Sequence, residues 1–348
     1  MICFSVGAKE HILPFELLMV KIKNGMQYAP IALFTYNRAD HTKQAVESLL
    51  KNAEAQYSDL FIFSDGPKNE KAVEGVKKNR EYLQSLKNDN DTLTLRYTDA
   101  TITPYFRSVT IIEREKNWGL ANSLIAGITE IVNKYGRVIV VEDDLILSPY
   151  FLRYMNEALE KYKDEDRVAS ISAFLNPIDC EAPETFFLRY FACWGWATWK
   201  RGWDILINDD RVLLKRLRWK KNDFNIGGTG PFYGILYCDK VGLNDSWAVR
   251  FYASQFLAGK LQLFPGRTMA IQTGTDGSGT HGTVVDHKYD GMQLSMEPIH
   301  VGDIAIEESK EMYDAFARFY CTGQKITFKA EWERFKSFIR RLIGIDYW

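Results

Sequence analysis

RVIVVEDDL, residues 137–145, joins a strand-like run to a cluster of negative charge. Val138 to Val141 are all β-branched and uncharged, which predicts a buried strand. The run leads directly into Glu142, Asp143 and Asp144. Adjacent carboxylates repel one another, and a buried ion is costly unless it is paired or metal-bound. We therefore predict that these acids lie at the mouth of a sheet and hold a divalent cation and a polar ligand; the alternative is a solvated turn.

The composition of the 348 residues is that of a folded protein with a sizeable core. The chain is 46% hydrophobic and 14% aromatic, which excludes global disorder. Its 44 basic and 45 acidic residues give a net charge of -1, which argues against a general nucleic-acid binder. The five cysteines are odd in number and form no C-x-x-C, so a disulfide framework or structural zinc site is disfavoured and a reducing compartment is expected. No apolar run approaches the ~20 residues of a membrane span.

Strand-like and helix-like segments alternate four times in the first half of the chain. The predicted strands are 31–36, 60–63, 108–112 and 138–141, each of the first three followed by a helical pattern, and a further strand is predicted at 168–173. This alternation predicts an α/β fold with a mostly parallel sheet flanked by helices. Helix starts are predicted at Asp40 as an N-cap, and at Ser148 as an N-cap followed by Pro149.

Polar residues follow each predicted strand, and the carboxyl ends of parallel strands meet at one edge of a sheet. Besides the three acids, these residues are Thr35, Asn37, Arg38, Asp65, Gly66, Asn117 and Gly119. We therefore expect one ligand-binding rim. No G-x-G-x-x-G follows the first strand and no P-loop motif occurs, which disfavours a dinucleotide oxidoreductase or a P-loop enzyme.

The second half of the chain is rich in aromatic residues, and three of its features have two interpretations each. The aromatic cluster over residues 186–203 is either core or a surface that stacks on sugar rings. Asp245 is either a plain N-cap or a functional carboxylate. The glycine-rich loop 274–282 is either solvated or able to present backbone N–H groups to a phosphate, and its His281 is either structural or a ligand.

At this point the chain resembles a known class of enzymes. PIALFTYNR at 30–38, the Asp65-Gly66 turn and the VEDD strand end at 141–144 resemble GT-A nucleotide-sugar glycosyltransferases. The Glu-Asp-Asp form is similar to that of N-acetylglucosaminyltransferase I and its relatives, and bacterial polysaccharide transferases carry similar sequences. Later features occur in the order of that subfamily, namely Ser172-Ala173, Gly195-Trp196, Asp245 with Trp247, Arg267-Thr268-Met269, and His281-Gly282.

The resemblance implies a GT-A, Rossmann-like fold and a hexosyl- or N-acetylhexosaminyltransferase that uses Mn²⁺ or Mg²⁺ and a UDP-linked sugar. It implies that Asp144 coordinates the metal, and that Glu142 and Asp143 contact the base or ribose. Thr35, Asn37, Arg38, Asp65 and Asn117 would line the nucleotide site, Asp245 would be the general base, and His281 would lie near the diphosphate or metal. The chemistry is consistent, since a cation stabilises the departing diphosphate and one base opposite the leaving group gives inversion.

Alternatives stay open at this stage. Asp209, Asp210 and Asp239 are rival carboxylates for the base. A sugar nucleotidyltransferase shares the scaffold but normally has a glycine-rich loop after the first strand, where this chain has Tyr36-Asn37-Arg38-Ala39. A carbohydrate-binding module would use the tryptophans as stacking platforms.

We expect four segments along the chain. These are a peripheral segment at 1–29, a nucleotide-sugar-binding half at 30–150, an acceptor and catalytic half of the same domain at 151–300, and a helical extension at 301–348. Residues 328–348 predict a basic, aromatic amphipathic helix that either packs on the domain or contacts a membrane surface. The expected location is cytoplasmic, peripheral at the cytoplasmic face of the membrane, with a glycan or lipid-linked acceptor and a role in surface polysaccharide synthesis.

Overall fold

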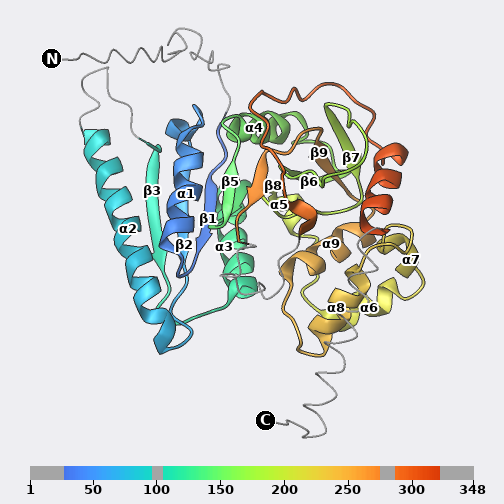
Figure 1. Cartoon of the computed structure of the whole chain (residues 1–348), viewed down its shortest axis with the longest axis horizontal. Coiled ribbons are helices and arrows are strands. Elements are labelled where there is room, and N and C mark those ends of the chain that lie inside the picture. The colour runs from blue at the N-terminus through green and yellow to red at the C-terminus, as the bar shows by residue number, and fades with distance from the viewer. Residues whose placement is uncertain (1–26, 96–104, 275–286, 322–348) are drawn as a thin grey trace, which may run out of the picture.

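The computed structural model describes residues 27–95, 105–274 and 287–321, and a large twisted sheet organises them (Figure 1). Within these ranges the sheet has eight strands in the order β3-β2-β1-β4-β8-β6-β9-β7. The strands are β1 (Ile31–Thr35), β2 (Asp59–Ser64), β3 (Ser108–Glu113), β4 (Arg137–Glu142), β6 (Val168–Ser172), β7 (Thr185–Leu188), β8 (Trp196–Trp199) and β9 (Leu261–Pro265). A second, two-stranded sheet pairs β5 (Leu145–Leu147) with β10 (Ala270–Gln272) in antiparallel fashion.

The pairing confirms the predicted mostly parallel sheet. Strand β1 lies between β2 and β4 and is parallel to both, and β3 is parallel to β2. Strand β8 is inserted antiparallel between β4 and β6, and β7 is antiparallel to β9 at the edge. Since β1 to β4 all run in one direction, their carboxyl ends share one rim, as the alternation of strands and helices predicted.

Helices cover both faces of the sheet because the buried strands are apolar on both sides. In β4, Ile139 and Val141 enter one core and Val138 and Val140 enter the other. The helices are α1 (Ala39–Leu50), α2 (Glu70–Leu95), α3 (Leu120–Tyr135), α4 (Phe151–Lys161), α5 (Lys200–Trp203), α6 (Asp210–Leu217), α7 (Lys221–Phe224), α8 (Phe232–Lys240) and α9 (Trp247–Leu257), with short 3-10 turns at Ala55–Tyr57 and His287–Tyr289. Side chains of α1, α2 and α4 line the first core, and those of α3, α6, α8 and α9 line the second.

The two predicted helix starts need correction. Helix α1 has Arg38 at its N-cap, and Asp40 lies in the first turn, where a carboxylate still faces the positive end of the helix dipole. Helix α4 has Tyr150 at its N-cap. The Ser148 hydroxyl lies two residues earlier, where it accepts from the N–H of Tyr150 at 3.2 Å and donates to the carbonyl oxygen of Ser295 at 2.7 Å.

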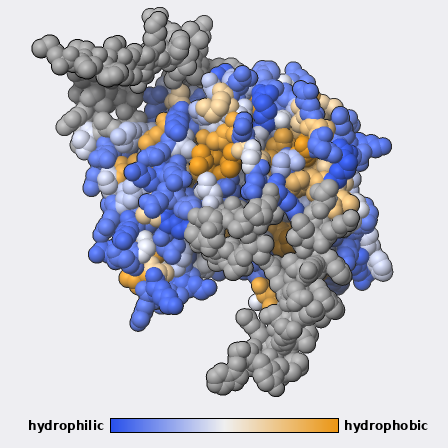
Figure 2. Space-filling model, in the orientation of Figure 1, coloured by the Kyte–Doolittle hydropathy of each residue, from blue (hydrophilic) through white to orange (hydrophobic). Residues whose placement is uncertain are grey.

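The aromatic segment belongs to the second core, so the core interpretation is confirmed for most of it. Phe186, Phe191, Trp196 and Trp203 are almost fully buried. Helix 310–321 closes the same core with Met312 and Phe316. The predicted boundaries of the four segments stay predictions, and residues 328–348 lie outside the described ranges. On the face shown in Figure 2, hydrophilic residues predominate and hydrophobic ones gather in limited patches.

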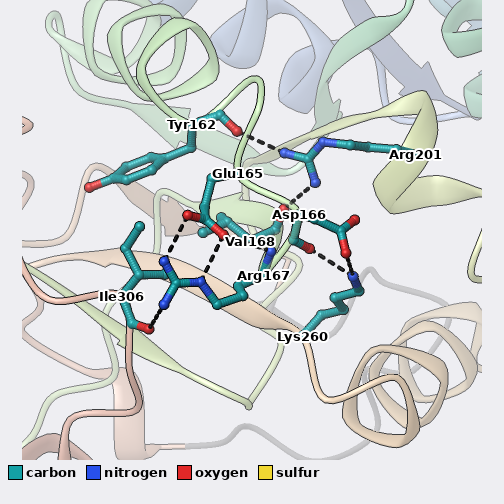
Figure 3. A network of polar contacts seen from close by, with 8 residues as sticks. All are labelled: Tyr162, Glu165, Asp166, Arg167, Val168, Arg201, Lys260 and Ile306. Carbon is teal, nitrogen blue, oxygen red and sulfur yellow. Dashed lines mark hydrogen bonds and ion pairs between the residues drawn. The ribbon is translucent and has the colours of Figure 1, made fainter.

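A polar network fixes the turn that leads from α4 into β6 (Figure 3). The Arg201 guanidinium donates to the carbonyl oxygens of Val168 at 2.6 Å and Tyr162 at 2.8 Å. Arg167 pairs with Glu165 and also reaches the carbonyl oxygen of Ile306. These contacts lie at the amino ends of β6 and β9, the edge of the sheet opposite the rim, so we assign them a structural role.

Candidate active site

The acids that follow β4 meet an arginine that follows β1. Arg38 Nη2 lies 2.6 Å from Asp143 Oδ1 and 2.9 Å from Asp144 Oδ2. The backbone N–H of Tyr36 donates to Asp143 Oδ2 at 3.2 Å. Residues about a hundred positions apart in the chain thus form one cluster, because the carboxyl ends of β1 and β4 are neighbours. The predicted rim is present at this point.

The cluster holds three acidic side chains and one basic side chain. Burial, followed by the charges of Asp144 and Asp143, raises the pKa of Glu142 to about 8. Burial also raises the pKa of Asp143, although Arg38 opposes the rise. Three acidic side chains therefore lie near one guanidinium in a poorly solvated place, and an additional positive charge there would favour their ionised forms.

The donor set fits a hard divalent cation. Asp144 and Asp143 offer carboxylate oxygens, the ligands that Mg²⁺ and Mn²⁺ prefer. In the described ranges no group of three or more histidine, cysteine, aspartate or glutamate side chains is arranged to hold a metal ion. A cation here would take one or two carboxylates from the protein and its other ligands from water or a substrate phosphate, which is the usual mode for Mg²⁺.

Gly274 leaves room for the Asp144 carboxylate. The segment after β10 is tied to the acids by the N–H of Thr273, which donates to the carbonyl oxygen of Asp144 at 2.7 Å. A Cβ atom at position 274 would clash with Asp144 Oδ2 and lie 3.1 Å from Arg38 Nη1. This position was not predicted as a site residue, since a glycine in a glycine-rich loop looks like any other glycine.

Gly274→Ala is expected to weaken Mn²⁺-dependent UDP binding by about tenfold or more, because the new methyl group must displace the Asp144 carboxylate. Isothermal titration of UDP in the presence of Mn²⁺ measures the effect. Gly302→Ala is the matched control, since a Cβ there meets no atom nearer than 3.6 Å. Unchanged UDP affinity in Gly274→Ala, in a variant that unfolds at the wild-type temperature, would contradict the expectation.

A second polar group lies on the same rim, at the ends of β2 and β3. The Asp65 carboxylate accepts from the N–H groups of Gly66, Trp118 and Gly119 and from Asn117 Nδ2, at 2.8 to 3.0 Å. Asp65 and Asn117 therefore hold the loop before α3 in place. The N–H of Asp65 donates to the carbonyl oxygen of Thr35 at 3.1 Å, which connects this group to β1.

Thr35 and Asn37, on the same rim, both contact residues of helix α2. Thr35 Oγ1 accepts from Asn79 Nδ2 at 3.1 Å. The Oδ1 atom of Asn79 is buried and has no hydrogen-bond partner among the described residues. Asn37 lies against Gly75 of α2, where a Cβ atom would come within 2.7 Å of the Asn37 carbonyl oxygen. Asn79 could not be recognised from the sequence, because one asparagine on a charged helix looks solvent-exposed.

Asp245 precedes α9 but is not its cap. The N-cap is Ser246, whose Oγ accepts from the N–H of Val249 at 3.3 Å. The interpretation of Asp245 as a plain N-cap is therefore wrong. Its carboxylate accepts from Arg250 Nη2 at 2.7 Å, and its side chain is 62% exposed.

Buried Arg250 gathers three carboxylates. Besides Asp245, its Nη1 lies 3.4 Å from Asp239 Oδ2 and 3.9 Å from Asp210 Oδ1. Asp239 also accepts from the N–H of Ser246 at 2.9 Å, and burial raises the pKa of Asp239 to about 6. Arg250, which the sequence analysis missed, is thus the residue that holds Asp245 in place.

The rival carboxylate Asp209 has a structural role. It is the N-cap of α6 and accepts from the N–H groups of Arg211 at 2.9 Å and Val212 at 3.1 Å. Four carboxylates lie near the starts of α6 and α9, namely Asp209, Asp210, Asp239 and Asp245. Among these four, Asp245 is highly exposed and is also held by the buried guanidinium of Arg250. It is the one best placed to meet a substrate.

Packing connects Asp245 to the acids. Trp247 stacks on Trp196 with ring centroids 5.5 Å apart, and Trp196 pairs with Val140 near the end of β4. The beginning of α9 therefore lies towards the carboxyl end of β4. The Cys193 thiol lies near the acids, since burial, followed by the charges of Glu142 and Asp144, raises its pKa. His281 lies outside the described residues, so its role stays a prediction.

An α/β sheet with acids and an arginine at the carboxyl ends of its parallel strands has the arrangement in which α/β proteins bind ligands. The model of the GNT-I family matches residues 7–209, more than half of the chain. The chain belongs to the GNT-I family and is a glycosyltransferase, as the resemblance implied. No match was found among curated proteins.

Three solved structures are similar in parts. A UDP-glucose pyrophosphorylase complexed with UDP-glucose has a TM-score of 0.30 and 10% identity, over 51% of this chain and 79% of that one. One from Acinetobacter baumanii has a TM-score of 0.35 and 10% identity, over 70% and 87%. A putative glucose-1-phosphate thymidylyltransferase from Bacillus anthracis has a TM-score of 0.24 and 13% identity, over 41% and 53%. Similarity at this level carries no inference about activity.

Proposed function

We propose that the chain is an inverting, metal-dependent glycosyltransferase that moves a sugar from a UDP-linked donor to a hydroxyl of a glycan or lipid-linked acceptor, in surface polysaccharide synthesis. The observation that carries the proposal is the contact of Arg38 with Asp143 and Asp144 at the carboxyl end of β4. This contact forms an acidic site, with the Arg38 guanidinium as its positive charge, at the edge where α/β sheets bind their ligands. Membership of the GNT-I family supports the same reaction class.

In the donor half, Asp144 would hold the cation, with Asp143 kept in place by Arg38 and the N–H of Tyr36. The bound cation supplies positive charge where negative charge develops on the departing diphosphate. Glu142 and Asp143 are proposed to contact the base or ribose. Thr35 and Asp65 would shape the nucleotide pocket through the hydrogen bonds that fix the loops around it.

In the acceptor half, Asp245 would accept the proton of the attacking hydroxyl. A single carboxylate on the side opposite the leaving group gives inversion at the anomeric carbon by one displacement. Arg250 orients the Asp245 carboxylate at 2.7 Å, so the base has a defined position before the acceptor binds. His281 is proposed to lie near the diphosphate or the metal.

The acceptor is proposed to be reached at the cytoplasmic face of a membrane, with residues 328–348 as a peripheral contact. Within the described ranges, no helix is both long and apolar enough to cross a bilayer.

Incubation of the full-length chain with a panel of UDP-sugars and Mn²⁺ tests the proposal. Slow release of UDP by hydrolysis of one donor, abolished by EDTA and restored by Mn²⁺, is the expected result. Pyrophosphate formation from UTP and a sugar phosphate would instead identify a nucleotidyltransferase. Saccharide binding without any turnover would identify a carbohydrate-binding protein.

A further inference from the structure

Residues 211–221 form a strongly basic segment on an otherwise acidic protein. The segment runs from α6 into the first residue of α7 and contains no acidic residue. Its six basic residues are Arg211, Lys215, Arg216, Arg218, Lys220 and Lys221, all of them exposed. Removing these six charges from the net charge of -1 leaves -7 for the rest of the chain. We call these six residues, together with Trp219, the basic patch.

The cations of the basic patch have no carboxylate partners among the described residues. Arg218 lies over the Trp219 ring at 5.1 Å, and Lys221 lies over the Tyr233 ring at 4.9 Å. Some other exposed lysines are paired, as Lys200 is with Asp204 at 2.7 Å. The charge of the basic patch is therefore left uncompensated and is available to an external anion.

Trp219 is unusual in its exposure. Its side chain is 85% exposed, whereas tryptophan is largely buried in most folded proteins. It follows α6, whose Leu213, Leu214 and Leu217 turn inward and fill the core. Tyr237, Val241 and Leu243, on α8 and the turn after it, are also exposed, and α8 packs against α6. An aromatic ring among cations, with aliphatic side chains on the adjoining helix, is typical of a surface that rests on a membrane interface.

We propose that the basic patch docks this enzyme on the anionic headgroups of a lipid bilayer. The positive charges complement the headgroup phosphates, and Trp219 inserts at the level between headgroups and acyl chains. Nucleic acid is the less favoured partner, because exposed Val241 and Leu243 gain nothing from a phosphate backbone but are buried by a membrane.

The basic patch begins at the candidate catalytic carboxylates. Asp210, the first residue of α6, lies 3.9 Å from the guanidinium that holds Asp245. At a rise of 1.5 Å per residue, the eight residues of α6 span roughly 12 Å. Docking through the basic patch would thus place Asp245 near the headgroup region, where a lipid-linked acceptor presents its sugar. This consequence rests on the proposed function, whereas docking itself does not.

Flotation of the full-length chain with vesicles tests the docking. Wild type is expected to float with phosphatidylcholine vesicles that contain roughly 30% phosphatidylglycerol and not with pure phosphatidylcholine. The triple variant Arg216→Gln/Arg218→Gln/Lys220→Gln is expected to bind at least about tenfold more weakly, and Trp219→Ala about threefold more weakly. The matched control, Lys71→Gln/Lys77→Gln/Lys78→Gln on α2, removes the same charge from exposed positions and should bind as wild type does.

Three outcomes would overturn the docking proposal. These are equal binding of the triple variant and wild type, equal loss in the α2 control, and release of the protein from vesicles by a short DNA duplex at equimolar phosphate. UDP release by hydrolysis of the UDP-sugar in solution is measured for the same proteins. Wild type that floats but releases no UDP would refute the proposed function and leave the docking intact, whereas a triple variant that releases UDP normally but no longer floats supports both.

Discussion

Asp144→Asn is expected to lower sugar transfer by about 100-fold or more and to remove the Mn²⁺-dependence of UDP binding. Asparagine keeps the size of the side chain and one oxygen, so the loop before β5 should fold as before. What it removes is the negative charge that faces Arg38 and that a divalent cation needs. Titration of UDP with and without Mn²⁺ separates the loss of the cation from a loss of nucleotide contacts, because the metal-independent part of the affinity should persist.

The control for this variant is Asp204→Asn, which removes an exposed carboxylate paired with Lys200 on the short helix α5. Transfer and UDP affinity in that variant should stay within experimental error of wild type. If Asp144→Asn binds UDP with Mn²⁺ as tightly as wild type does, Asp144 does not hold the metal. Asp143 would then be the carboxylate to replace next, since it shares Arg38 with Asp144.

The cluster of Arg38 with the acids, the proposed donor side of the site, could be predicted from the sequence because it follows from the regular part of the fold. Apolar β-branched runs separated by helical patterns predict parallel strands, and parallel strands bring their carboxyl ends together. Arg38 and Asp143 are 105 positions apart, yet the rule that places both on one rim needs no knowledge of side-chain packing. The same rule placed Asp65 and Asn117 correctly, although their hydrogen bonds show that they hold a loop.

The surroundings of Asp245, the proposed acceptor side, could not be predicted in detail, because they depend on tertiary contacts between irregular segments. Asp245 and Ser246 are equally good N-caps by residue type. What decides between them is Arg250 on the next turn of α9, which takes the Asp245 carboxylate and leaves the cap to Ser246. Gly274 is a similar case, since its importance comes from the position of Asp144 and not from its own neighbours in the chain.

Asp245→Asn is expected to preserve UDP binding and to lower transfer to the acceptor by about 10²- to 10⁴-fold, the usual contribution of a general base. Asparagine can still accept from Arg250 Nη2, so the start of α9 and its Ser246 cap should remain. Only the ability to take a proton is removed. The measurements are kcat with saturating donor and acceptor, and UDP affinity by titration. The value of kcat should fall while the UDP affinity stays unchanged.

Asp209→Asn and Asp239→Asn test whether another carboxylate accepts the proton of the attacking hydroxyl. Asp209→Asn should keep near-wild-type transfer, since asparagine is an equally good N-cap for α6. Asp239 is the rival base, and its pKa of about 6 makes a distinct prediction. If Asp239 took the proton, kcat would rise as the pH increases through about 6, and Asp239→Asn would remove that limb of the profile. Transfer by Asp245→Asn within threefold of wild type would refute the assignment of the base to Asp245, and a limb that disappears in Asp239→Asn would move that role to Asp239.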